Sequence, residues 1–144
     1  MATLKTNTLT GTSTAGSIAV TGEGNSTTTN LQQGLCKAWL NFNGSTTDSG
    51  TDLDGVRDSF NIASVVDQAT GNTVTNLTNN MGNTNYSGYM YSNATTSGTG
   101  RTNFNNNYTG GFGDHATDSF GTHSFADDSA DASLNFNGLF GDLA

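Results

Sequence analysis

Acidic residues and histidines are the side chains of this sequence that could bind a metal ion. Residues 48–55 have the sequence DSGTDLDG and alternate acids ahead of a glycine, as calcium-binding loops do. An EF-hand loop, however, needs an oxygen ligand where this segment has Gly50, and it ends in a glutamate that is missing here. We interpret the segment as an acidic hairpin tip, with a bound cation as the alternative.

The two histidines, His115 and His123, lie near Asp114 and Asp118. Around the threefold axis of an oligomer, three copies of such a residue could surround a metal ion. Their spacing is not that of a metal-binding motif, and single histidines on strands are usually ordinary polar residues. We therefore predict no metal site and no cofactor, and the histidines remain the second place where a cation could bind.

Catalysis would need a positioned pair of side chains. Cys36 is the only cysteine, and its place in the apolar run LCKAW at residues 35–39 favours a small buried hydrophobe. A nucleophilic cysteine needs a neighbouring base, and nothing in the sequence selects either histidine for that role. Carboxylates are numerous enough for a glycosidase pair, but 144 residues are too few for the large groove of a depolymerase. We predict that the protein is not an enzyme.

The charge of the chain argues against nucleic acid as a partner. Four lysines and arginines stand against twelve acids, which gives a net charge of −8. The four cations are scattered, whereas phosphate binding needs a basic stripe. No apolar run approaches the roughly 20 residues of a membrane span, and the first residues lack the apolar core of a signal peptide. We therefore predict no nucleic acid, no membrane insertion and no export signal.

The supply of core-forming residues is small. Thr, Ser, Asn and Gly make up 77 of the 144 residues, whereas Leu, Ile, Val and Phe total only 25. Such a composition lies near the range where disorder competes with folding. Because a short chain buries a limited part of its surface alone, we predict an obligate homo-oligomer in which neighbouring copies supply the missing contacts. The single cysteine fits production in a reducing cytoplasm.

Short runs of aromatic and β-branched residues, separated by Gly and Asn, predict strands from residue 35 onward. Apolar residues fall two apart in residues 60–64 and 133–137, as in strands with one face on a core. Residues 69–72, ATGN, predict a hairpin turn. The predicted fold is all-β, an antiparallel β-sandwich or small barrel. The expected strands span residues 37–43, 56–67, 73–78, 86–91, 115–125 and 132–140.

One pentapeptide, LNFNG, occurs twice, at residues 40–44 and 134–138. In a chain so rich in Asn and Gly, the repeat could arise by chance. The alternative is that two strands occupy equivalent places in one sheet.

The composition changes at residue 34. Residues 1–34 consist mostly of Thr, Ser, Gly and Asn around the apolar residues 18–20. We predict an extended arm that docks on a partner or a neighbouring subunit, with a disordered tail as the alternative. Near its end Thr29 or Asn30 can cap a helical turn, which Gly34 stops. Residues 35–144 form the predicted β-sandwich domain.

Between residues 86 and 125, aromatic side chains stand among Gly, Asn and Ser, a composition typical of long display loops. Aromatic residues on adaptable loops are common in recognition surfaces. They could equally pack beneath the loops or at contacts between subunits. The predicted binding residues are Tyr89, Tyr91, Phe104, Tyr108 and Phe112.

Several segments resemble a domain common at the ends of bacteriophage tail-fibre and other virion proteins. They are KAWLNFNG at residues 37–44, VRDSFNIASVVD at 56–67 followed by Gly71, NLT at 76–78, Met81, NY at 85–86 and LFGDLA at 139–144. The resemblance spans about residues 35–144, and the Thr-rich lead-in is similar to leaders of marine phage proteins. Two departures are Gly82, where the family usually has proline, and residues 45–55, which form a longer loop than their counterparts.

The resemblance implies a trimeric, jelly-roll-like β-sandwich of a virion, made in the cytoplasm of a host bacterium. It does not distinguish tail from head. We therefore predict a structural protein of the phage particle, of the tail-fibre type, that contributes to attachment to a host-cell surface glycan or protein. The alternative is a capsid decoration (cement) protein whose N-terminal arm clamps the major capsid protein. Both hypotheses make other virion proteins its partners.

Overall fold

The computed structural model describes residues 3–11, 18–21, 28–46, 55–93, 101–104, 116–125, 132 and 134–142. Its contacts divide the chain into two units, Met1–Leu35 and Cys36–Ala144. In the described part of the first unit, strands β1 (Ala19–Thr21) and β2 (Thr28–Asn30) pair antiparallel. The helical turn α1 (Leu31–Gly34) follows β2 directly, which confirms the turn that the sequence predicts.

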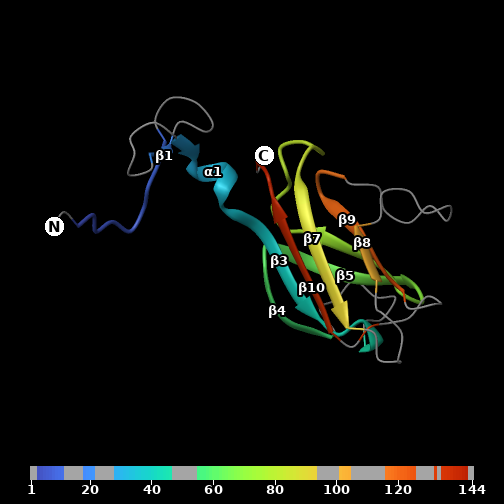
Figure 1. Ribbon diagram of the computed structural model, residues 1–144. Helices are drawn as coiled ribbons and strands as arrows, with labels where there is room; N and C mark the ends of the chain where they lie inside the picture. The colour runs from blue at the N-terminus through green and yellow to red at the C-terminus, as the bar shows by residue number, and fades with distance from the viewer. Residues whose placement is uncertain are drawn as a thin grey trace. The chain divides into compact units, whose positions relative to one another are not determined.

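In the described part of the second unit, the strands form two four-stranded antiparallel sheets (Figure 1). The first sheet has the order β4-β3-β10-β7, and the second has the order β5-β6-β9-β8. This arrangement confirms the predicted all-β, antiparallel class. The bounds are β3 Cys36–Phe42, β4 Val56–Phe60, β5 Ile62–Ala69, β6 Asn72–Leu77, β7 Ser87–Asn93, β8 Arg101–Phe104, β9 Ser119–Phe125 and β10 Leu134–Phe140.

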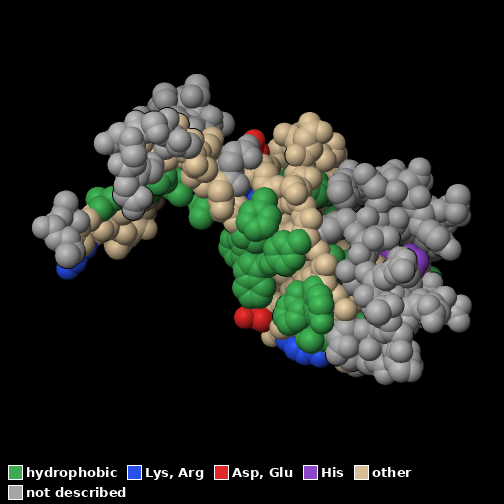
Figure 2. Space-filling model, viewed as in Figure 1, with side chains coloured by type: hydrophobic (Ala, Val, Ile, Leu, Met, Phe, Trp, Pro, Cys, Tyr) green, Lys and Arg blue, Asp and Glu red, His purple; other side chains and the backbone are tan. Residues whose placement is uncertain are grey.

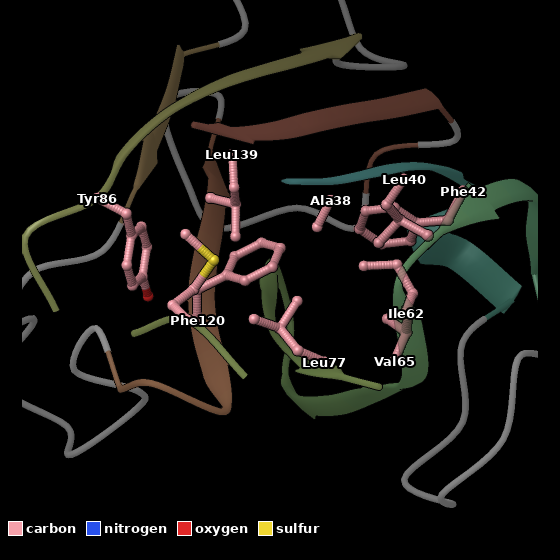
Figure 3. Packing of buried hydrophobic residues seen from close by; sticks show 10 residues of the cluster. Ala38, Leu40, Phe42, Ile62, Val65, Leu77, Tyr86, Phe120 and Leu139 are labelled. Carbon is pink, nitrogen blue, oxygen red and sulfur yellow. The ribbon is translucent and has the colours of Figure 1, made fainter. Parts of the chain in front are cut away.

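The hydrophobic core lies between the two sheets, as in a β-sandwich (Figure 3). Successive strand residues point to opposite sides, so every second residue of β3 enters the core. The buried side chains are Ala38, Leu40 and Phe42 of β3, Leu139 of β10, Ile62, Val65, Leu77 and Phe120 of the second sheet, and Met81 and Tyr86. Burial, and secondarily the charge of Asp118, raise the pKa of Tyr86 to about 12.

The chain changes sheets at Asn61, and this corrects the prediction of one continuous strand over residues 56–67. Strand β4 ends at Phe60 in the first sheet, and β5 begins at Ile62 in the second. Asn61 has a φ of 61°, a left-handed conformation that Asn adopts more readily than most residues. The expected alternation therefore fails here, because Ile62 is buried while Phe60 remains 51% exposed.

The two LNFNG segments lie side by side but face opposite ways. Asn135 pairs with Phe42, Phe136 with Asn41 and Asn137 with Leu40 in the antiparallel β3–β10 ladder. In β3 the Leu and Phe enter the core, whereas in β10 Asn135 and Asn137 are buried and Phe136 is 37% exposed. The prediction that the alternation in residues 133–137 points its apolar residues at the core is therefore wrong.

The predicted hairpin is confirmed. Ala69 pairs with Asn72 across the turn between β5 and β6, and Gly71 has a φ of 76° that glycine adopts without strain. The remaining expected strands lie within a few residues of observed ones. Strand β8 (Arg101–Phe104) pairs with β9 where display loops were expected, so that expectation is wrong for this segment.

Candidate binding surface

The outer side of the β4-β3-β10-β7 sheet carries a cluster of aromatic side chains, which we call the aromatic face. Because strand residues alternate, the residues between the buried members of each strand point away from the core. Figure 2 shows hydrophobic side chains gathered on this side of the molecule. The aromatic face consists of Trp39, Phe60, Tyr89, Tyr91, Phe136 and Phe140.

Strand pairing places five of these six residues, all but Phe140, in two neighbouring rows across the sheet. Trp39 is paired with Phe60 on one side and with Gly138 on the other, and Gly138 is in turn paired with Tyr89. In the next row Phe136 lies between its partners Tyr91 and Asn41. Side chains paired in this way contact one another across adjacent strands. The aromatic face is therefore a continuous surface that four strands build together.

Four of the six aromatic side chains on this face are exposed to solvent. The exposed fraction is 51% for Phe60, 52% for Tyr89, 58% for Tyr91 and 37% for Phe136, while Trp39 and Phe140 are half-buried. Single exposed apolar residues are ordinary, but contiguous apolar patches mark surfaces that bind something. The clustering on one sheet face is what makes this surface the candidate site.

Gly138 determines how the ring of Tyr89 lies. A Cβ atom at position 138 would be 2.4 Å from Cε1, 2.6 Å from Cζ and 2.8 Å from the hydroxyl oxygen of Tyr89. The ring therefore lies directly over the glycine backbone, in space that any other residue would fill. Tyr89 is still 52% exposed, so part of its ring faces the solvent.

Two ring pairs stiffen the surface. The rings of Tyr89 and Phe140 have centroids 6.1 Å apart and a tilt of 35°, and those of Tyr91 and Phe136 are 6.4 Å apart with a tilt of 36°. Tilted pairs at such distances are favourable because the positive edge of one ring approaches the negative face of the other. Both tyrosines are thus supported by a phenylalanine of β10.

Polar groups border the aromatic rings. Arg57 Nη1 donates to Asn41 Oδ1 over 3.3 Å, and the Ser59 N–H donates to Asp58 Oδ1 over 2.9 Å. Arg57 and Asp58 are both exposed and their charges cancel, and alternation places Lys37 on the same side, where it is buried. Among the described residues, the aromatic face is thus close to neutral although the chain carries a net charge of −8.

Only part of the predicted binding set is brought together. Tyr89 and Tyr91 both lie on strand β7, which confirms the strand expected over residues 86–91 and not the display loop to which the two tyrosines were also assigned. Phe104 lies on β8 in the other sheet, and Tyr108 and Phe112 lie outside the described residues. The sequence prediction missed Trp39, Phe60, Phe136 and Phe140, because apolar alternation alone assigns such residues to the core.

The remaining candidate residues in the described part of the chain are His123 and Cys36. Burial lowers the pKa of His123, which favours the neutral imidazole, and Cys36 Sγ donates to the Ala38 carbonyl over 3.0 Å. The described residues contain no group of His, Cys, Asp and Glu suited to a metal ion, while residues 48–54 and His115 lie outside them. In the same described part, no helix is both long and apolar enough to span a membrane.

Comparisons with protein-family models, with curated proteins and with solved structures find no match to this chain. The resemblance to phage tail-fibre domains, with the assembly and partners that it implies, therefore remains a prediction.

Proposed function

We propose that this protein is a structural component of a bacteriophage particle, of the tail-fibre type, that contributes to host attachment through the aromatic face. The observation that supports this proposal is the concentration of half-exposed rings on one near-neutral sheet surface. Aromatic side chains supply large contact areas at a low cost in conformational entropy, and for this reason they are enriched in binding surfaces. The proposed role is binding without catalysis.

The finer architecture belongs to the same proposal. We infer a jelly-roll-like β-sandwich that assembles as a trimer, with residues 1–34 as an arm that docks on other virion proteins. The small number of core-forming residues favours assembly, because 25 Leu, Ile, Val and Phe residues leave one copy with a thin core. Six of the aromatic rings of that chain are on an outer surface rather than in the core, which thins it further.

Capsid decoration is the second candidate. Its specific support is the division of the chain into Met1–Leu35 and Cys36–Ala144, since a separate N-terminal unit could clamp neighbouring capsid subunits. In that case the arm is the binding element, and the aromatic face is not required for attachment.

Binding of the labelled protein to susceptible host cells and to assembled phage heads separates the two candidates. We expect binding to cells, and we expect a double variant, Tyr89→Ala with Tyr91→Ala, to lose most of it while remaining folded and assembled. A Gln68→Ala variant, which changes an exposed side chain of β5 in the other sheet, is the matched control. Binding to heads alone would replace the attachment function with decoration.

A further inference from the structure

We propose that the aromatic face binds a neutral polysaccharide, with a pyranose ring stacked on the outward side of Tyr89. This inference rests on the proposed function and names its ligand class. The site consists of Tyr89 over Gly138, the neighbouring rings of the aromatic face, and the polar groups of Asn41 and Asp58 at its border.

The orientation of Tyr89 is the first step of the argument. A sugar ring has one side covered by C–H groups that carry small positive charges, and this side is attracted to the negative face of an aromatic ring. Because the Tyr89 ring lies over Gly138 and remains 52% exposed, part of the ring is open to a ligand from the solvent side. That presentation suits stacking with a flat ligand.

The charge of the surface selects among flat ligands. Nucleic-acid bases also stack on aromatic rings, but nucleic-acid binding requires a basic groove that follows the phosphates. The described charges at this surface are the exposed Arg57 and Asp58, which cancel, and the buried Lys37, on a chain with a net charge of −8. Nucleic acids and acidic polysaccharides would be repelled by such a molecule, whereas a neutral sugar would not.

The polar groups at the border meet the second requirement of a sugar ligand. Sugar hydroxyls must keep hydrogen-bond partners when water is displaced. The Tyr89 and Tyr91 hydroxyls can donate and accept, the Asp58 carboxylate accepts, and the Asn41 amide can do both. Asp58 is exposed and Asn41 is half-buried, so both border the rings from the solvent side.

The length of the surface favours a chain over a single sugar. The row that runs from Phe60 through Trp39 and Gly138 to Tyr89 crosses four strands. At about 4.8 Å between strands it extends over roughly 14 Å, which exceeds the size of one pyranose ring. We therefore expect an oligosaccharide to bind and its monosaccharide to bind much more weakly.

Trp39 gives a direct readout, because it is the only tryptophan of the chain and belongs to the aromatic face. We would titrate the full-length protein with cellohexaose, mannohexaose and glucose while recording tryptophan fluorescence. Native gels containing galactomannan, mixed-linkage β-glucan or the acidic alginate would measure retardation. We expect a saturable fluorescence change with at least one hexasaccharide, retardation by a neutral polymer, and neither effect with glucose or alginate.

Variants connect the binding to the proposed geometry. Tyr89→Ala should weaken binding about tenfold or more through loss of the stacking ring, whereas Tyr89→Phe keeps the ring and should lose much less. Gly138→Ala should also weaken binding, since its Cβ would displace the Tyr89 ring. Gln68→Ala should bind as the unchanged protein does, and thermal unfolding would verify that every variant is folded.

Three results would overturn the inference. One is a failure of all neutral probes to retard the protein, and another is equal binding by Tyr89→Ala. The third is a change of oligomeric state in Tyr89→Ala, measured by light scattering, which would make the aromatic face an interface between copies. Retained binding to host cells without polysaccharide binding would reject the ligand class and leave the attachment function standing.

Discussion

Asn61 is the residue that joins the two sheets. Its side-chain Nδ2 donates to the carbonyls of Lys37 and Asn79 over 3.0 Å each, and its Oδ1 accepts from the Asn79 N–H over 2.7 Å. Lys37 belongs to the first sheet, whereas Asn79 follows β6 of the second. One side chain thus fastens the crossover to both layers while its own backbone takes a left-handed conformation.

Replacing Asn61 should be costly, and two variants separate the causes. Asn61→Ala loses the hydrogen bonds and must also adopt φ of 61° with a Cβ atom, so we expect a loss of about 3 kcal/mol in the free energy of unfolding. Asn61→Gly loses the same hydrogen bonds without the steric penalty, and we expect it to lose about 1 kcal/mol less. Urea denaturation measures both, and equal losses would mean that the backbone conformation contributes nothing.

His123 makes the stability depend on pH. Burial lowers its pKa below the ordinary value of 6.5, so the unfolded chain takes up a proton at a pH where the folded protein does not. Acidification therefore favours the unfolded state, and the free energy of unfolding should fall as the pH drops from about 7.5 to 5. The His123→Asn variant should fall less over that range. Parallel curves for the two proteins would contradict the assignment.

Asn137 is a buried polar residue whose amide finds no hydrogen-bond partner among the described residues. An unpaired amide in a core costs free energy, and an apolar side chain of similar volume avoids that cost. We expect Asn137→Leu to raise the free energy of unfolding by about 1 kcal/mol, measured in urea. A clear loss of stability would show that the amide is hydrogen-bonded in solution.

At the scale of elements, β3 and β10 show how the same residues acquire different roles. Both strands contain LNF, yet Phe42 is 1% exposed and belongs to the core, while Phe136 is 37% exposed and belongs to the aromatic face. A shift by one residue reverses the facing of a strand, and local sequence alone does not set that choice. The choice follows from the pairing of β10 between β3 and β7.

The matched pair of phenylalanines tests this difference directly. Phe42→Ala should cost about 3–5 kcal/mol in the free energy of unfolding because it leaves a cavity in the core. Phe136→Ala, in an identical pentapeptide, should cost less than about 1 kcal/mol. Denaturation curves for the two variants provide the comparison. Similar losses would mean that Phe136 is buried in solution, for instance by another copy.

The fold class could be predicted from the sequence for a physical reason. Gly and Asn interrupt short runs of β-branched and aromatic residues, and this pattern predicts strands. The prediction does not depend on which strands pair with one another. The Ala69–Asn72 hairpin was equally local, since it depends on Gly71. The crossover at Asn61 could not be predicted from the sequence, because a residue in the left-handed backbone conformation leaves no signal in the residues around it.

The residues of the candidate site could be predicted only in part from the sequence, for a related reason. Tyr89 and Tyr91 were predicted from composition, but their partners come from three other strands that are distant in the sequence. Gly138 admits the Tyr89 ring only because the β10–β7 register places it opposite that residue. Contacts of this kind are decided by strand order, so a single sequence does not reveal them.

At the scale of the whole molecule, the chain assigns its aromatic residues unevenly. Phe42 and Phe120 are fully buried in the core, whereas six other rings form the outer aromatic face. A 144-residue chain with so few core-forming residues gives up stability by keeping that surface outside. Placing these aromatic rings on the surface lowers the stability of the fold. That loss has a functional reason if the surface binds a partner or ligand.

The division into two units leads to a test of the whole chain. The described hydrophobic core is built from residues 38–139, all within the unit Cys36–Ala144. Deleting residues 2–30 should therefore leave the β-sheet domain folded, with a melting temperature within a few degrees of the full chain. If the arm docks on virion proteins, the same deletion should abolish incorporation into particles, while the Tyr89→Ala, Tyr91→Ala variant should still be incorporated. Unfolding of the truncated protein would instead assign the first unit a role in stability, and unchanged incorporation would place the docking surface in the second unit.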